Sequence, residues 1–273
     1  MIRSLLLLFA AASGIEGGVA VYTPIEPLFA ESDAVVVARC VSVERNDPAE
    51  PVERDGHLVP LDYILSYSTV KVYKDGKMPA AFRIFYPVRD PAEGTPGCGP
   101  GFALLFLKSG GSGKAYTLAN FAFGLRQFPG RPSNGRVGLT LLEELETDAA
   151  GFLSSGGARA EMALRLLDDF DDLSEAGANA LASFAGRLDP GASVLRLEIL
   201  VRAGRPEYFE ALVRELLDRP PAETPAGLCD ALEKGRSAKD LPALEELERR
   251  TPADSPLRDC AVRGLRSLRT GAF

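Results

Sequence analysis

Residues 33–43 read DAVVVARCVSV, and this stretch decides the fold of the first half of the chain. β-branched valines dominate it, and its apolar residues show little helical spacing. The polar triplet Glu31-Ser32-Asp33 leads into it. The stretch therefore predicts a long strand that is covered in part on both faces.

Further strand patterns follow along the chain. The segment from Tyr63 to Tyr73 alternates apolar and polar residues, and Lys74-Asp75-Gly76-Lys77 after it predicts a tight turn. The other strand patterns are at residues 81–86, at 102–107 and at 116–118 leading into 121–123. Short strands separated by polar turns predict a small, closed or nearly closed all-β barrel.

From Thr140 onward the apolar residues recur at helical spacing, and Leu, Ala, Glu and Arg dominate. Ser174-Glu175 predicts the start of one helix and Pro206 that of another. Gly and Pro mark the breaks between helices, at 156–157, 189–191, 204 and 220–221. Short helices joined by brief breaks form antiparallel pairs, which tend to stack. The pattern predicts a HEAT-like helical array, with an irregular helical bundle as the alternative.

These patterns divide the chain into a β part followed by an all-α part. We predict an OB-like β-barrel at residues 28–128, a linker at 129–139 and a helical domain of stacked antiparallel helix pairs at 140–273. Charge divides at the same place, with a net charge of +1 before residue 140 and −8 from there on. An acidic chain repels phosphate backbones and anionic lipids, so nucleic-acid binding and membrane-surface binding are disfavoured.

The N-terminus has the pattern of a secretory signal peptide, which we place at residues 1–20. Arg3 precedes the apolar run Leu5–Ala12, and Ala11-Ala12-Ser13 supplies small residues at a cleavage point. The run is shorter than the roughly 20 apolar residues that span a bilayer, so cleavage is favoured over anchoring. A buried N-terminal helix is the alternative. The sequence thus predicts an exported protein, periplasmic or extracellular, without stable membrane insertion.

Four cysteines are divided evenly between the two parts: Cys40, Cys98, Cys229 and Cys260. In an exported chain this distribution predicts one disulfide in each part. Of the three formal pairings we favour Cys40 with Cys98 and Cys229 with Cys260, because each closes a loop within one compositional unit. A zinc site does not fit, since the cysteines are far apart in sequence and His57 is the only histidine.

Other clusters of reactive side chains have simpler interpretations. The acidic run Asp168–Asp172 lacks the spacing of an EF-hand, so a solvated helix end is preferred over a calcium site. Glu245-Glu246 and Glu248-Arg249-Arg250 are interpreted as an exposed helix face. Residues 110–114, GGSGK, lack the spacing of a phosphate-binding loop and predict a flexible hairpin turn. We therefore predict no catalytic residue, no metal ligand and no cofactor.

Several short motifs resemble the netrin-like, or tissue-inhibitor-of-metalloproteinase-like, OB-fold barrel. They are Ser32–Arg39, the strand end Val72-Tyr73-Lys74, and Cys98-Gly99 shortly before Leu104–Leu107. The resemblance covers residues 28–128 and implies that Cys98 is disulfide-bonded, in agreement with the pairing above. The inhibitors of that family chelate zinc through a cysteine at the mature N-terminus. No cysteine precedes Cys40 in this chain, so that mechanism does not carry over.

A fold does not decide a function. The export pattern, the lack of a recognisable catalytic constellation and two architectures that commonly present binding faces favour a non-catalytic protein-protein interaction module. Two alternatives stay open. A hydrolase with dispersed carboxylates predicts a concave pocket that holds at least two Asp or Glu side chains with perturbed ionisation. A protease inhibitor would act instead through the loops of the barrel.

Overall fold

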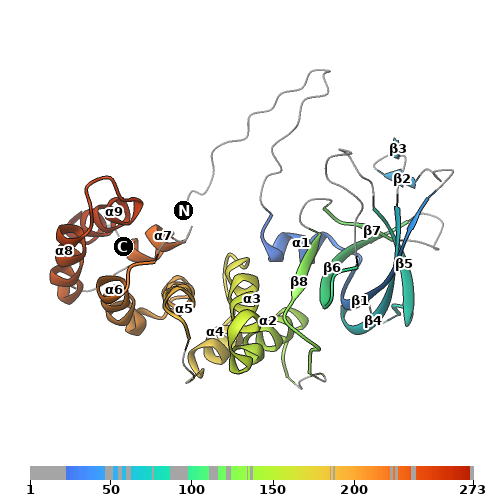
Figure 1. Ribbon diagram of the computed structural model, residues 1–273, viewed down its shortest axis with the longest axis horizontal. Coiled ribbons are helices and arrows are strands. Elements are labelled where there is room, and N and C mark those ends of the chain that lie inside the picture. Colours follow the sequence, from blue (N-terminus) through green and yellow to red (C-terminus); the bar gives the residue numbers. More distant parts are fainter. Residues whose placement is uncertain are drawn as a thin grey trace.

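The computed structural model describes residues 23–46, 52–54, 57–59, 63–75, 77–86, 98–110, 116–120, 124–133, 135, 138–184, 186, 188–221, 224, 227–234 and 238–270. The predicted signal peptide at 1–20 and the strand pattern at 121–123 lie outside these residues. A barrel of strands stands at one end of the molecule, and helices α8 and α9 lie at the other (Figure 1). The predicted order, a β part and then an α part, is confirmed.

The barrel is closed by five strands. They are β1 (Ala34–Arg45), β4 (Tyr63–Lys74), β5 (Ala81–Tyr86), β6 (Phe102–Ser109) and β7 (Tyr116–Leu118). β1 pairs with β4 on one side and with β6 on the other, and β5 and β7 complete the circuit between them. β5 and β7 run parallel, while the other neighbours in the circuit are antiparallel. The predicted closed barrel is confirmed, and its five strands fit an OB-like fold.

Four elements of this half have no counterpart in the sequence prediction. β8 (Leu125–Phe128) pairs with β6 outside the circuit, β2 (Val52–Arg54) and β3 (His57–Val59) form a separate hairpin, and α1 (Ile25–Glu31) precedes the barrel. Strands of three or four residues show at most two repeats of an alternating pattern, so β2, β3 and β8 escape prediction, although the sequence does predict β7 at 116–118. α1 has only seven residues, so no helical period is visible in it either.

The barrel interior is filled by apolar side chains. β1 contributes small ones, Ala34, Val36 and Ala38, and the other strands contribute larger ones. The larger ones are Leu65, Tyr67, Phe82, Ile84, Leu105, Leu107 and Leu118. The rings of Tyr67 and Phe82 stack with centroids 5.7 Å apart, and burial raises the pKa of Tyr67 to about 12. A barrel of this size is therefore a packed core with no channel through the described residues.

The helical part runs from residue 141 to residue 270. It consists of α2 (Leu141–Gly151), α3 (Gly157–Asp168), α4 (Glu175–Ala182), α5 (Pro190–Arg202), α6 (Phe209–Asp218), α7 (Leu228–Glu233), α8 (Leu241–Arg250) and α9 (Pro256–Thr270). Thr140 and Glu143 form a capping box at the start of α2, and Ser174 caps α4 as predicted. The sequence predicts a break between helices at 189–191. This is wrong for Pro190 and Gly191, which are the first residues of α5. The helix begins here because Asp189 caps its amides and proline suits the first helical position.

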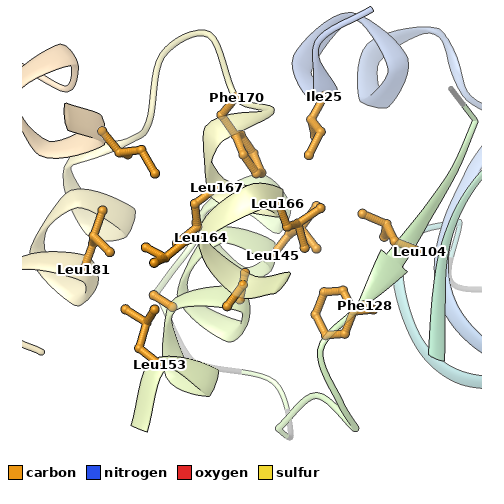
Figure 2. Packing of buried hydrophobic residues seen from close by; sticks show 14 of the residues in the cluster. Ile25, Leu104, Phe128, Leu145, Leu153, Leu164, Leu166, Leu167, Phe170 and Leu181 are labelled. Atoms are coloured by element: carbon orange, nitrogen blue, oxygen red, sulfur yellow. The ribbon is translucent and has the colours of Figure 1, made fainter. Parts of the chain in front are cut away.

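One apolar cluster, which we call the junction core, joins the outside of the barrel to the first helices. Ile25 of α1, Leu104 of β6 and Phe128 of β8 point toward Leu145 and Leu166 of the helices (Figure 2). Its other buried members include Leu28, Val35, Val37, Tyr73, Phe106, Leu153, Leu164, Leu167, Phe170, Leu181, Ile199 and Leu200. The barrel and α2 to α5 therefore share one core.

A second cluster, the C-terminal core, extends from α5 to α9. α5 serves both cores, because Ile199 and Leu200 belong to the junction core while Val194, Leu197 and Val201 belong to the C-terminal core. The junction core and the C-terminal core therefore meet at α5, which contributes buried apolar residues to both. Pro129 and Gly130, in the predicted linker at 129–139, are buried. The division into domains at that linker stays a prediction.

Most helices that are two apart in the chain pack against one another, α4 and α6 being the exception. α2 packs on α4, α3 on α5, α5 on α7, α6 on α8 and α7 on α9. These helices are thus side by side, which places residues about one helix pair apart in sequence next to each other in space.

Candidate functional site

Both disulfides are present in the pairing that the sequence predicts. Cys40 of β1 is bonded to Cys98, which precedes β6, with a Cα–Cα distance of 5.2 Å and a sequence separation of 58. Cys229 of α7 is bonded to Cys260 of α9, with a Cα–Cα distance of 4.3 Å and a separation of 31. The second bond links alternate helices, as expected from the helical pattern.

A network of charged and polar groups lies where β4 meets α2. Lys71 and Tyr73 are two residues apart on β4, so their side chains leave the same face of the strand. The Lys71 ammonium lies 2.7 Å from Glu144 Oε1 and 2.5 Å from Asp148 Oδ2, and the Tyr73 hydroxyl donates to Asp148 Oδ2 at 2.7 Å. Glu144 and Asp148 are one helical turn apart, which places both carboxylates over the strand.

Asp148 is the centre of this network. Its side chain is fully buried, and its second oxygen, Oδ1, accepts a hydrogen bond of 2.6 Å from the Ser133 hydroxyl. Burial and the neighbouring Asp148 carboxylate raise the pKa of Tyr73 far above its usual range, so the phenol keeps its proton. Each reactive group is thus engaged with another, and the arrangement holds β4, α2 and the segment at Ser133 together.

Glu146, on a different side of α2, is also buried and holds a helix start. Its carboxylate accepts the Ser174 amide at 3.2 Å and the Ser174 hydroxyl at the beginning of α4. Desolvation raises the pKa of Glu146, and these hydrogen bonds lower it less than burial raises it. A Cβ atom at Gly177 would lie 2.4 Å from Glu146 Oε2, so glycine is needed there for the close approach of α4.

The acidic run at 168–172 lies at a meeting point of several elements. Asp168 pairs with Arg202 of α5, and Asp169 pairs with Arg126 of β8 at 2.9 Å. The prediction of a solvated helix end is therefore wrong for these two half-buried residues, and it is confirmed for the exposed Asp171 and Asp172. Arginines from two elements, α5 and β8, compensate the local negative charge at the C-terminal end of α3. Glu26 of α1 adds a further carboxylate, which accepts hydrogen bonds from the backbone amides of Asp171 and Asp172. Within the described residues no group of His, Cys, Asp and Glu is placed to hold a metal ion.

The remaining predicted features have simple outcomes. His57 lies in β3 and pairs with Arg54 of β2 in the backbone register of the hairpin. Residues 111–115 are outside the described chain, and the strands before and after them, β6 and β7, are antiparallel neighbours as a hairpin requires. On α8, Glu246 pairs with Arg249 and Arg250, and both arginines are exposed. The prediction of an exposed helix face there is confirmed.

Three clefts are lined by described residues. One of about 600 Å³ lies between the ends of α2 and α4, and its lining of small, hydroxyl and apolar residues contains no described carboxylate. One of about 350 Å³ between β8 and α3 contains Asp168 and Asp169, both paired with arginine. One of about 440 Å³ beside α6, α8 and α9 is lined mainly by proline and leucine. None of the three linings includes Glu146, the buried carboxyl group with the raised pKa.

The outer surface of the barrel has a covered part and an open part. Along β1, Val35 and Val37 are fully buried in the junction core, whereas Arg39 is exposed and Val41 is 66% exposed. Neighbouring strands continue the exposed side in two rows of cross-strand partners, Arg39–Ser68–Ala81 and Ser42–Ser66–Arg83. We call the outer side of these residues, together with Val41, the open face.

Sequence reasoning missed both the network at Asp148 and the open face. Lys71 and Asp148 are 77 residues apart, and only the packing of α2 on β4 brings them together. In β1 the change from valines to Arg39 is visible in the sequence, yet the pattern does not show which half of the strand the helices cover.

Comparison with family models, with curated proteins and with solved structures found no match for this chain. The netrin-like resemblance therefore depends on the short motifs in residues 28–128 alone. None of the helices in the described part of the chain has the length and apolar character that a membrane span requires.

Proposed function

We propose that this chain is an exported, non-catalytic binding protein that contacts a protein partner through the open face of its barrel. One observation carries the proposal. On the same side of β1, Val35 and Val37 are buried beneath the helices, while Arg39 and Val41 are left exposed. Arginine is enriched in protein interfaces, and an exposed aliphatic side chain next to it gains by burial on association.

The position of the open face supports this assignment. OB-folds bind oligonucleotides and oligosaccharides on the face of their second and third strands, so this face of the barrel is suited to binding, and β4 and β5 take those places here. Among the described residues the helices pack against β1, β6, β8 and the end of β4, so β5 keeps its outer side exposed at Ala81 and Arg83. The open face is thus compatible with the predicted netrin-like barrel, acting without its family's N-terminal zinc chelator.

The engagement of the buried charges supports a non-catalytic role. Asp148 holds Lys71, Tyr73 and Ser133, and Glu146 caps α4. A third buried carboxylate, that of Glu198, pairs with Arg202 on the same helix. A general base or nucleophile has to reach a substrate, and these groups are turned toward neighbouring elements of the protein. The alternative of a hydrolase with dispersed carboxylates requires at least two Asp or Glu side chains with perturbed ionisation in a concave pocket. The described linings of the three clefts contain Asp168 and Asp169, both paired with arginine, and do not favour it.

The helical part is proposed as a HEAT-like array of stacked pairs. Contacts between the ends of α3, α5, α7 and α9 recur at a nearly constant sequence separation. Arg202 donates to Asp168 at a separation of 34, Lys234 to the Arg202 carbonyl at 32, and Ser267 to the Glu233 carbonyl at 34. A constant step is what repeated units produce, and the barrel then covers the first pair as a capping unit does.

Export is the second part of the proposal. Two disulfides fit an oxidising compartment, and the predicted signal peptide at 1–20 supplies the route. Cell fractionation and N-terminal sequencing of the mature protein test this part. We expect a mature chain outside the cytoplasm that lacks the apolar run Leu5–Ala12 and begins between this run and residue 21. An uncleaved cytoplasmic chain with free thiols would contradict it.

The binding surface is tested by photo-crosslinking from single positions. Val41 and Leu141 are matched probes, because both are exposed aliphatic side chains at 66% and 48%, and Leu141 lies on α2 away from the open face. In cells that produce the full chain, we expect one defined protein to be captured from position 41 and not from position 141. Arg83→Glu should reduce that capture. Equal capture from both positions, or capture unaffected by Arg83→Glu, would contradict the assignment.

A further inference from the structure

The two disulfides differ in the exposure of one cysteine. Cys40 and Cys229 are both half-buried and pack against the barrel interior and the C-terminal core respectively, whereas their partners differ. Cys98 is exposed, as are the next three residues, Gly99, Pro100 and Gly101. A Cβ atom built at Gly99 or Gly101 would meet no other heavy atom within 4 Å, so this short segment stands clear of its neighbours. Cys260 is only 2% exposed and belongs to the C-terminal core, against which Cys229 packs.

This difference controls access to the sulfur atoms. Exchange requires a thiolate to approach one sulfur in line with the S–S bond, so an exposed sulfur reacts and a buried one does not. α7 and α9 are in close contact around the second bond, since a Cβ atom at Gly264 would lie 2.8 Å from the Leu232 carbonyl oxygen. A thiolate therefore reaches Cys260 only after these helices separate, whereas it reaches Cys98 in the folded protein.

We propose that Cys40–Cys98 is a thiol-disulfide exchange site for a dithiol oxidoreductase, and that Cys229–Cys260 is a permanent cross-link. A thiolate of the oxidoreductase attacks Cys98 Sγ, a mixed disulfide forms, and Cys40 leaves as a thiolate that takes a proton from water. The second thiolate of the oxidoreductase then attacks its own sulfur in the mixed disulfide and releases the Cys98 thiolate. The cysteine pair gains two electrons, and the oxidoreductase becomes a disulfide.

The barrel keeps its closure when this bond opens. β1 remains hydrogen-bonded to β4 on one side and to β6 on the other, with Cys40 opposite Tyr67. The change is local to the place where β1 shifts register, between Cys40 and Ser42, and where Val41 is exposed. Exchange is therefore reversible without unfolding. The proposed exchange site does not depend on the open face binding a partner.

Alkylation after mild reduction tests the difference between the two bonds. The full oxidised chain is incubated with reduced glutathione, sampled over time, alkylated with iodoacetamide and mapped by mass spectrometry. We expect Cys40 and Cys98 to become alkylated at least about 100-fold faster than Cys229 and Cys260, because the second pair waits for local unfolding. In guanidinium the rates should converge. Equal rates in the folded protein, or faster opening of Cys229–Cys260, would overturn the proposal.

Trapping identifies the sulfur that is attacked. The probe is a thioredoxin-like oxidoreductase whose second cysteine is replaced by serine, so that the mixed disulfide persists. We expect it on Cys98, both in the native chain and in a Cys229→Ser/Cys260→Ser variant, and we expect no complex with a Cys40→Ser/Cys98→Ser variant. The native chain alone decides the outcome if a variant fails to fold. A complex at Cys40, Cys229 or Cys260 would overturn the assignment.

Discussion

The junction core and the C-terminal core are built from similar leucines and alanines, yet they are held together differently. The junction core is flanked by buried charged groups, with Lys71 and Asp148 on one side and Glu146 on another. The C-terminal core also borders one buried charge, because Glu198 of α5 is fully buried and pairs with Arg202 at 3.1 Å. In addition, a disulfide joins α7 to α9, and the backbones approach closely at Gly264. The difference reflects which elements pack together, strands against helices in the junction core and helices against helices in the C-terminal core. A strand surface and a helix share no common spacing, so specific polar pairs set their register, whereas two helices pack by a repeated pattern.

The sharpest way to separate the two cores is to remove the cross-link of one. Cys229→Ser with Cys260→Ser should lower the free energy of unfolding by about 4 kcal/mol, from the chain-entropy model applied to a separation of 31 residues. The loss should appear as unfolding of α6 to α9 at a lower urea concentration than in the native protein. Limited proteolysis and far-UV circular dichroism measure this unfolding.

The matched control opens the other bond. Cys40→Ser with Cys98→Ser should cause a loss of similar size, about 4 kcal/mol, with the earliest proteolytic cuts in the barrel. If both double variants unfold in one transition with the same cleavage pattern, the two cores do not act as separate units.

A smaller effect is expected from breaking the charged network of the junction core. Asp148→Ala should cost about 3 kcal/mol, because it removes one partner of a buried ion pair and leaves the Tyr73 and Ser133 hydroxyls without their acceptor. Glu144→Ala should cost less, about 1 kcal/mol, because Lys71 keeps its ion pair with the fully buried Asp148. Urea unfolding measures both. Equal losses would show that Asp148 is not the centre of the network.

The sequence predicts local structure well where a pattern is long enough, and this explains what it misses. The strand pattern at 81–86 coincides with β5, and Ser174 begins α4 as expected. α1 and β8 are too short for a period to be read, and they matter because they cover the junction core. The cysteine pairing follows from counting within each compositional unit. The network at Asp148 depends on contacts between distant residues, which local patterns do not encode.

Close packing in the C-terminal core is tested at Gly264 on α9. Gly264→Ala should cost about 2 kcal/mol, because the new methyl group would meet the Leu232 backbone and force α7 and α9 apart. Gly151→Ala, at the end of α2 with open space around it, should instead stabilise the protein by about 0.5 kcal/mol through its better helix propensity. Thermal unfolding compares the two. A neutral Gly264→Ala would mean that the helices separate easily, and that Cys260 is less protected than we infer.

The smallest expected effect concerns Glu146 and depends on pH. Its pKa in the folded protein is raised above the ordinary value of 4.5, mainly by desolvation, and the nearby carboxylates Glu26 and Glu143 raise it further, while Ser174 hydrogen bonds oppose the shift. The folded protein therefore holds this proton more tightly than the unfolded chain does. The stabilising contribution is fully present below pH 4.5 and is lost as the pH rises through the raised value.

Glu146→Gln removes this titration and keeps an acceptor for Ser174. The stability of the variant relative to the native protein should therefore increase between pH 4.5 and the raised pKa of Glu146, and then stay constant. Urea unfolding of both proteins from pH 4 to pH 8 measures this difference. Glu143→Gln is the control, because Glu143 is exposed and its pKa is lowered by the Thr140 amide and hydroxyl, so its effect has the opposite sign. A difference for Glu146→Gln that does not change with pH would mean that desolvation of this carboxylate is compensated in full by its hydrogen bonds, and the junction core would then tolerate its buried charges without loss of stability.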